Sequence, residues 1–254
     1  MRILIRLKNT EKKTIIPFNY NTILAGIVYT TLSDQGYSNY LHENKGFKYW
    51  SISKIYFHNY KTNTPKHEFI VYDGLSFIVS CPDTYFITTL MDGLIQRQHV
   101  LIKGQRMLVE SVEVEPTFKK EDEMKYYALS PICVRSKRLI DGKLKQYDLN
   151  PSEPQFFNQI CELIVKKYNQ FYDNEKYVPS DVHVSSQMRN VKGVRIAIKN
   201  KGYITYNRAY YLDLLVSAPP VLQDFLYDCG LGEKTAMGFG CVGIGEYNKR
   251  KQKF

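Results

Sequence analysis

The part of the chain richest in glycine is residues 229–244, CGLGEKTAMGFGCVGI, which also carries Lys234 and Phe239. Closely spaced glycines let backbone amides approach an anion, so phosphate binding is the first chemistry to consider. Residues 238–243 match the dinucleotide pattern G-x-G-x-x-G, but that pattern requires a following helix and only eleven residues remain. Glu233, which precedes the lysine, excludes a P-loop. A helix C-cap followed by a turn into a last strand is the structural alternative.

Composition points to a folded protein with an anionic partner. The chain has 254 residues and a formal net charge of +10, which favours a phosphate backbone as its partner. Its 21 tyrosines and 13 phenylalanines offer surfaces on which bases can stack, although most aromatic residues serve packing.

The five cysteines and the apolar segments indicate the cellular location of the protein. The cysteines are scattered, with no C-x-x-C pair and no zinc-site spacing, so we expect reduced thiols. The N-terminus has no apolar signal region, and no run approaches the roughly eighteen apolar residues of a membrane span. We therefore expect a cytoplasmic protein without membrane contact.

The elements of the first half follow the order β-α-β-β-α-β. MRILIRLK alternates apolar and basic residues, which predicts a half-buried strand. A helix is predicted over residues 24–32 and ends at 34–36, and a second helix is predicted over 39–44 with Ser38 as its cap. Further predicted elements are strands 49–58 and 68–80, a helix that begins after Pro82-Asp83 and runs through Leu94, and a strand over 98–115.

The second half repeats this order after a polar linker at 119–123. MKYYALSPICV predicts a first strand, and Ser152 with Gln155 predicts a capping box for a long helix. Strands near 193–199 and 203–217 and a short helix from 219 follow, and the glycine-rich loop leads into a last strand. The predicted fold class is α+β, with two tandem ferredoxin-like (βαββαβ) domains, 1–122 and 123–254, and a C-terminal glycine-rich loop.

Two separate motifs resemble a family of CRISPR-associated endoribonucleases in the RAMP superfamily, which cut the repeat RNA of precursor CRISPR transcripts. The first motif is GLGEKTAMGFG at 230–240, which matches the family's C-terminal glycine-rich signature. The second combines GIVY at 26–29 with YLHENKGFK at 40–48, in the family's catalytic region. The resemblance covers essentially the whole chain and implies two ferredoxin-like domains in tandem, in agreement with the order of elements.

The resemblance implies cleavage without a metal or cofactor, in which the ribose 2′-OH attacks the adjacent phosphate and leaves a 2′,3′-cyclic phosphate and a 5′-hydroxyl. It assigns His42 as the group that moves protons, Tyr29 as a phenolic partner at the scissile phosphate, and Lys48 as the positive charge for the oxyanion. Structural alternatives remain: His42 can serve the helix dipole, Tyr29 can pack, and Lys45 competes with Lys48.

The resemblance also implies that the glycine-rich loop binds RNA between the two domains. Lys234 would add charge, and Phe239 would either stack on a base or anchor the loop in the core. Elsewhere, dense basic stretches are candidates for an RNA track, although charge runs are often only solvated faces. The predicted RNA-binding residues are Gly230, Gly232, Lys234, Gly238, Phe239, Gly240, Arg195, Lys192, Arg135 and Lys137.

Two alternatives to an endoribonuclease were weighed. A binding module of the same architecture would hold repeat or guide RNA without cutting it. A general RNA-recognition domain would carry aromatic RNP motifs, and the sequence has none. The expected partners are CRISPR repeat RNA, single-stranded or hairpin, and other proteins of a CRISPR effector complex. A monomer and a homodimer are both compatible with the sequence.

Overall fold

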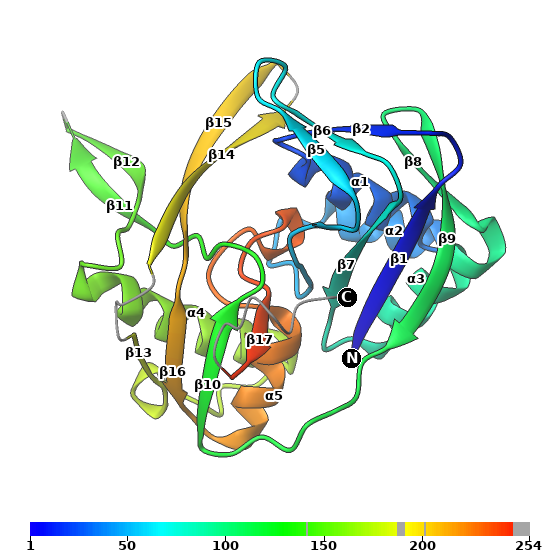
Figure 1. The fold of residues 1–254 in the computed structure, drawn as a ribbon. Coiled ribbons are helices and arrows are strands. Elements are labelled where there is room, and N and C mark those ends of the chain that lie inside the picture. Colours follow the sequence, from blue (N-terminus) through cyan, green and yellow to red (C-terminus); the bar gives the residue numbers. More distant parts are fainter. Residues whose placement is uncertain (141, 187–190, 201, 246–254) are drawn as a thin grey trace.

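The computed structural model describes residues 1–140, 142–186, 191–200 and 202–245 as two units that lie side by side (Figure 1). The first unit contains β1 (Arg2–Asn9), β2 (Thr14–Pro17), α1 (Asn21–Thr31), α2 (Gln35–Glu43), β3 (Ser51–Ile52), β4 (Tyr56–Phe57), β5 (Tyr60–Asn63), β6 (Glu68–Val71), β7 (Gly74–Ser80), α3 (Thr84–Arg97), β8 (His99–Ile102) and β9 (Gln105–Val114). The second contains β10 (Glu123–Ala128), β11 (Arg135–Ile140), β12 (Lys143–Asp148), α4 (Pro154–Phe171), the 3₁₀ turn η1 (Pro179–Asp181), β13 (His183–Ser185), β14 (Lys192–Asn200), β15 (Tyr203–Tyr211), β16 (Asp213–Ser217), α5 (Pro220–Cys229), the 3₁₀ turn η2 (Thr235–Met237) and β17 (Val242–Ile244).

Both units build an antiparallel sheet with the same strand order. The first sheet runs β3-β7-β1-β9-β8, and the second runs β13-β16-β10-β17. Counted along the β-α-β-β-α-β unit, each sheet therefore places its strands in the order second, third, first, fourth. The predicted α+β class with two tandem ferredoxin-like units is confirmed. The boundary at residues 122 and 123 stays a prediction.

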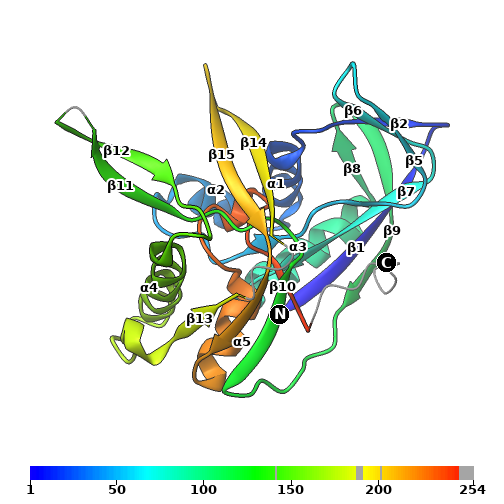
Figure 2. The ribbon, with the colours of Figure 1, turned by 60° about the vertical axis from the view of Figure 1, so that its left-hand side comes forward.

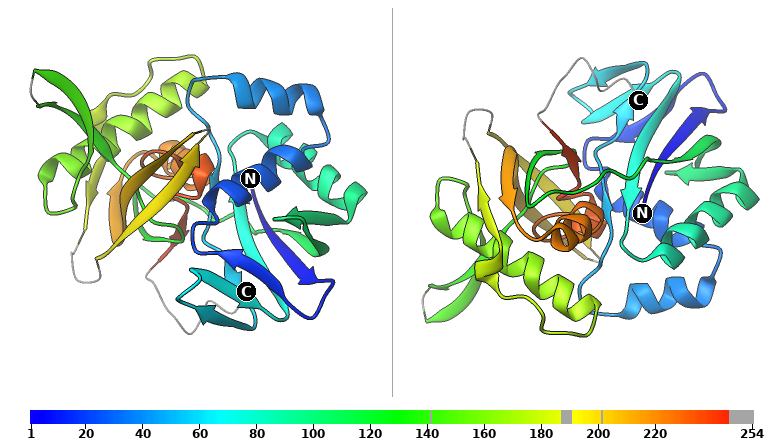
Figure 3. Two further views of the ribbon diagram at one scale, coloured as in Figure 1. Left: turned by 90° about the horizontal axis from the view of Figure 1, so that it is seen from above. Right: turned by 90° about the horizontal axis from the view of Figure 1, so that it is seen from below.

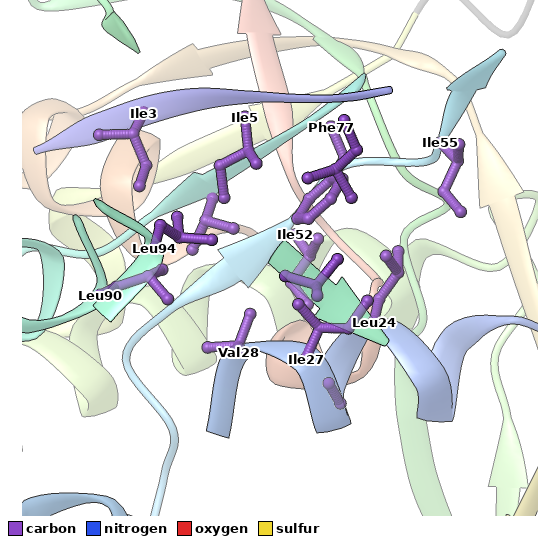
Figure 4. Packing of buried hydrophobic residues seen from close by; sticks show 14 of the residues in the cluster. Ile3, Ile5, Leu24, Ile27, Val28, Ile52, Ile55, Phe77, Leu90 and Leu94 are labelled. Carbon is purple, nitrogen blue, oxygen red and sulfur yellow. The ribbon is translucent and has the colours of Figure 1, made fainter. Parts of the chain in front are cut away.

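The core of the first unit lies between its sheet and the helices α1 and α3. Ile3 and Ile5 of β1 point from the sheet toward Leu24 and Val28 of α1 (Figure 4), and all four are nearly inaccessible to solvent. These residues repeat with period two on the strand and at helical spacing on α1, which is the pattern that buries one face of each. Helices α4 and α5 cover the second sheet in the same way.

The second unit covers the start of β1, which the sequence predicted to expose one face. Arg2 and Leu4 on that face are only 3% and 5% exposed. The Arg2 guanidinium donates to the Val242 carbonyl at 2.8 Å and to the Tyr227 carbonyl at 2.7 Å, both in the second unit. The prediction of a half-buried strand was therefore wrong at its first residues, because a neighbouring unit replaces the solvent there.

Helix α2 begins four residues earlier than predicted. Asp34 is its N-cap, and its side chain accepts a hydrogen bond from the Tyr37 amide at 2.9 Å. Ser38, the predicted cap, lies inside the helix. Residues 34–36, expected only to end α1, thus also start α2, and the two helices form a tight hairpin.

Two β-hairpins extend from the second unit. β11–β12 and β14–β15 each form a separate two-stranded sheet, and both project from the body in Figures 1 and 2. The predicted strand near 193–199 is β14 of a hairpin, and β13 takes its expected place in the main sheet. The predicted strand 203–217 is divided between β15 of the same hairpin and β16 of the main sheet. The long alternating pattern of a hairpin does not differ from that of a sheet strand, which explains the error.

Three further boundaries differ from the predictions. α4 begins at Pro154 with Glu153 as its N-cap and without the predicted capping box, because Ser152 and Gln155 bind Asn150 and Ser136 instead. The predicted strand 49–58 is two short strands, β3 and β4. The predicted strand 68–80 is divided between β6, in a small sheet with β2 and β5, and β7 in the main sheet.

The glycine-rich segment 229–244 packs its backbone against neighbouring backbone. A Cβ atom on Gly240 would lie 1.9 Å from the Leu231 carbonyl oxygen, and one on Gly232 would lie 2.5 Å from the Cys133 carbonyl oxygen. Both residues have positive φ angles, +69° and +76°. Glycine is therefore required here by close approach as well as by conformation.

We expect Gly240→Ala to lower the free energy of unfolding by more than about 3 kcal/mol, because the methyl group must displace the Leu231 carbonyl. Gly104→Ala is the matched control, since Gly104 has φ +79° but open space around it, and only the left-handed conformation should cost it roughly 1–2 kcal/mol. Urea unfolding of both variants measures the difference. Equal losses would show that close approach is not what requires glycine at 240.

Candidate functional site

The hairpin of α1 and α2 brings Tyr29 and His42 together. Tyr29 lies in the last turns of α1 and His42 in the last turn of α2. Their ring centroids are 5.5 Å apart with an interplanar angle of 78°, an edge-to-face contact. The buried Ser38 hydroxyl donates to the Tyr29 carbonyl at 2.7 Å and so ties the two helices together at this level.

The surroundings of the two rings differ. Tyr29 is half-buried, with its ring against the buried Trp50 at a centroid distance of 5.6 Å, and burial raises the pKa of its phenol. The phenol is therefore neutral near pH 7 and can donate a hydrogen bond. His42 is exposed, on a helix that lies at the edge of the molecule (residues 35–43, Figure 3). A ligand can reach its imidazole without displacing other residues.

Lys48 lies at the end of the helix that carries His42. Its ammonium donates to the carbonyls of Leu41 and Asn44, which belong to the last turn and C-cap of α2. This position suits a cation, because the C-terminal carbonyls of a helix carry partial negative charge. Burial lowers the pKa of the Lys48 ammonium. The rival Lys45 is exposed, whereas these two contacts hold Lys48 beside α2.

The glycines predicted to bind RNA have internal roles in the structure. The amides of Gly230, Gly238 and Gly240 donate to the carbonyls of Leu226, Thr235 and Pro131. Together with the close approach at Gly232, these bonds explain the glycines by packing. RNA binding by this loop stays a prediction.

The two side chains singled out in this loop also point inward. Phe239 is fully buried against Cys133, Ile198 and Ala209, which fits the anchor alternative and leaves no face for a base. Lys234 has a left-handed backbone, and its ammonium donates to the Asn207 side-chain oxygen. Burial, followed by the nearby Arg135, lowers the pKa of Lys234.

The predicted basic residues of the hairpins differ in their availability. Arg135 on β11 is paired with Glu233, to which its Nε donates at 2.8 Å. Lys137 on β11 and Lys192 on β14 are exposed. Arg195 on β14 is also exposed, and its guanidinium carbon lies 4.2 Å from the ring centroid of Tyr206. The structure therefore does not bring these residues to the Tyr29–His42 contact, and their role as an RNA track stays a prediction.

Sequence reasoning did not single out Tyr206 or its neighbour Tyr203. Both lie on β15, at 55% and 62% exposure, next to the basic residues of β14. Exposed aromatic rings beside arginine are suited to stacking with bases. The density of tyrosine in YITYNRAYY, four in nine residues, was a signal that could have identified them.

We also searched the described residues for a metal site, a membrane-spanning helix and paired cysteines. They contain no group of three or more His, Cys, Asp or Glu side chains arranged to hold a metal ion, and none of their helices could cross a membrane. The five cysteines are free and buried.

Comparisons with known proteins match nearly the whole chain. The family model for the N-terminal part of CRISPR-associated protein Cas6 matches residues 15–113, and the model for its C-terminal part matches residues 112–244. The chain is 30% identical to the CRISPR-associated endoribonuclease Cas6 of Pyrococcus furiosus, over 98% of the chain and 91% of that protein. It is 29% identical to the CRISPR-associated endoribonuclease Cas6 1 of Methanocaldococcus jannaschii, over 100% of the chain and 96% of that protein.

Solved structures agree with these matches. A Cas6-related protein from Pyrococcus furiosus superposes with a TM-score of 0.84 at 24% identity, covering 98% of this chain and 99% of that one. A RAMP protein described as binding different RNA substrates superposes with a TM-score of 0.82 at 22% identity, covering 97% of this chain and 100% of that one. At these identities the likeness shows the shared fold.

We expect Ser38→Ala to lower the free energy of unfolding by about 1 kcal/mol, because it removes the buried hydrogen bond to the Tyr29 carbonyl. Ser33→Ala is the matched control, since Ser33 lies exposed in the turn between the same helices, and it should change stability by less than about 0.5 kcal/mol. Chemical denaturation measures both. If the two variants lose the same stability, this bond does not hold α2 against α1.

Proposed function

Because the chain belongs to the Cas6 family of CRISPR-associated proteins, whose curated relatives are endoribonucleases, we propose that it cuts repeat RNA in precursor CRISPR transcripts. The observation that carries this proposal is the contact between Tyr29 and His42, with Lys48 bound to the end of the same helix. The three residue types supply a proton carrier, a hydrogen-bond donor and a positive charge, which is what phosphodiester cleavage requires.

The proposed reaction uses the RNA's own 2′-hydroxyl as nucleophile. The 2′-oxygen forms a bond to the adjacent phosphorus as the bond to the 5′-oxygen breaks. The proton of the 2′-OH leaves to a base, and the 5′-oxygen takes up a proton. The products are a 2′,3′-cyclic phosphate and a 5′-hydroxyl, and the step needs no metal ion.

The geometry supports a role for each residue. His42 takes or delivers a proton, because its imidazole is exposed and its two ring nitrogens can accept and donate one. Tyr29 donates a hydrogen bond that positions the reacting oxygens, because burial keeps its phenol protonated. Lys48 stabilises the oxyanion, since two of its three donors are used by carbonyls and one remains.

RNA binding is part of the same proposal. Exposed Lys137, Lys192 and Arg195 on the two hairpins, together with Lys234 in the glycine-rich loop, would contact the RNA backbone. A binding protein of the same architecture that does not cut is the alternative, and the Tyr29–His42 contact favours cleavage over it. The five buried free thiols support the expected cytoplasmic location.

We expect His42→Ala to slow cleavage of repeat RNA by roughly 10²–10⁴-fold while affinity changes little, because general acid–base catalysis is lost but the binding surface is kept. His183→Ala is the control, since His183 is exposed on β13 in the second unit. Single-turnover cleavage and equilibrium binding measure the two effects. Unchanged turnover in His42→Ala would remove this residue from catalysis.

We expect the wild-type protein to cut repeat RNA at an unchanged rate in EDTA and to leave a cyclic-phosphate end. RNA with a single 2′-deoxy nucleotide at the cut should bind normally and stay intact, because its nucleophile is missing. Gel analysis with end-group identification measures both. Loss of activity in EDTA would contradict metal independence, and cutting of the deoxy substrate would contradict the nucleophile. Retention of intact wild-type RNA would support the non-cutting alternative.

A further inference from the structure

A cavity of about 240 Å³ opens where the two units meet, beside the proposed catalytic residues. Three segments line it: the chain after α2, one face of α4, and the glycine-rich loop. The lining residues are Gly46, Phe47, Lys48, Leu163, Lys167, Glu233, Lys234, Thr235, Ala236 and Met237. We call this space the seam cavity. Lys48 belongs both to its wall and to the end of the His42 helix.

The wall of the seam cavity carries three ammonium groups, and all three donate to uncharged oxygens. Lys48 binds two main-chain carbonyls of α2, Lys167 binds the Gly232 carbonyl at 2.8 Å, and Lys234 binds the Asn207 amide oxygen. Within the described residues, no ion pair involves any of these three lysines. None of the three ammonium groups therefore has a carboxylate in direct contact among the described residues.

The single carboxylate in the wall is already paired. Glu233 is held by Arg135, whose Nε donates to Glu233 Oε2 at 2.8 Å. Arg135 acts to lower the pKa of Lys234, whereas Glu233 and the nearby Asp148 act more weakly to raise it. The three lysines thus remain in excess over the acidic groups that line the cavity.

Lys167 is the most unusual of the three. It is only 4% exposed, although lysine is almost never buried without a paired charge. Burying an ammonium group costs free energy that one carbonyl hydrogen bond does not fully return. At Lys48 and Lys234, which are half-buried, burial lowers the pKa of the ammonium group. An anion in the seam cavity would relieve this cost at all three lysines.

We propose that the seam cavity binds one phosphodiester of the RNA next to the cut, distinct from the scissile phosphate, and that Lys167 and Lys234 are positioning residues for it. This inference rests on the proposed endoribonuclease function. RNA backbone is the source of the phosphate because the cavity adjoins the proposed catalytic residues through Lys48. A space of about 240 Å³ is large enough for one phosphate group and part of its sugar.

The test is a double-mutant cycle between Lys167 and individual phosphates. The RNA is a repeat with a 2′-deoxy nucleotide at the cut, and a neutral methylphosphonate replaces one phosphate at a time. Lys167→Met keeps the aliphatic stem and removes the charge. At one phosphate near the cut we expect the methylphosphonate and Lys167→Met each to weaken binding about 10-fold, and both together no more than either alone.

Two further variants make the result decisive. Lys119→Gln removes an exposed charge from the connection between the units and should leave affinity and the methylphosphonate effect unchanged. Lys234→Asn is compatible with the left-handed backbone at residue 234. If Lys167→Met does not fold, the same double-mutant cycle with methylphosphonate RNA is measured with Lys234→Asn. This variant should also reduce the dependence of log affinity on log salt by about 0.7.

The outcomes separate this inference from the function on which it rests. The seam cavity is not a phosphate site if the affinity losses from the lysine substitution and from the methylphosphonate multiply at every phosphate. If the wild-type protein still binds and cuts repeat RNA, the nuclease proposal stands. A wild-type protein that neither binds nor cuts the RNA would overturn both. Coupling confined to the scissile phosphate would show that the lysines belong to the catalytic centre itself.

Discussion

Backbone contact along residues 229–244 determines how the two units meet. Gly240 and Gly232 bring this segment so close to Leu231 and Cys133 that no side chain fits between. The segment then binds the first unit through neutral hydrogen bonds: the Asn21 amide donates to the Met237 carbonyl at 2.8 Å at the start of α1, and the Thr235 hydroxyl donates to the Lys48 carbonyl at 3.4 Å. A change in the glycine-rich segment therefore reaches the helix of Tyr29 and the main chain of Lys48 together.

The basic side chains fall into two classes, according to whether they have structural partners or border an open space. Arg2 is structural, since its buried guanidinium binds two carbonyls across the seam and lies 3.7 Å from the Tyr227 ring centroid. Arg135 is likewise occupied, by Glu233. Lys48 and Lys167 instead donate to neutral groups around an open space. A net charge of +10 does not distinguish these classes, because it depends on composition and not on which acceptors are near.

Periodicity predicted the order of elements, the two ferredoxin-like units and the helices α1, α3 and α5, because these depend on local patterns of burial. It failed where a segment distant in the sequence determines the burial or the hydrogen-bond partner of a residue. Arg2 was expected in solvent but is buried by the second unit. Ser38 was expected as a cap, but it bonds to α1 and Asp34 caps instead. Lys167 follows the polar pattern of α4, and only the fold shows that Gly232 covers it. For the site, motifs identified Tyr29 and His42, whose ring contact depends on a turn that spacing alone does not determine.

Polar bonds add to a limited apolar contact in holding the helix of His42. Ser38 is the only fully buried residue of α2, and the apolar anchoring of the helix is limited to the partly buried Tyr37 and Leu41. Asp34 caps α2 and accepts the Tyr85 hydroxyl of α3 at 2.7 Å, while Asp83 caps α3 and accepts the Tyr37 hydroxyl of α2 at 2.6 Å. The Tyr37 amide and the Tyr85 hydroxyl keep the pKa of Asp34 below its usual value, so this cap stays ionised at neutral pH. Such directional bonds fix the orientation of a helix while leaving its outer face free. The catalytic role proposed for His42 needs both, because the imidazole must hold its position against Tyr29 and still admit an RNA strand.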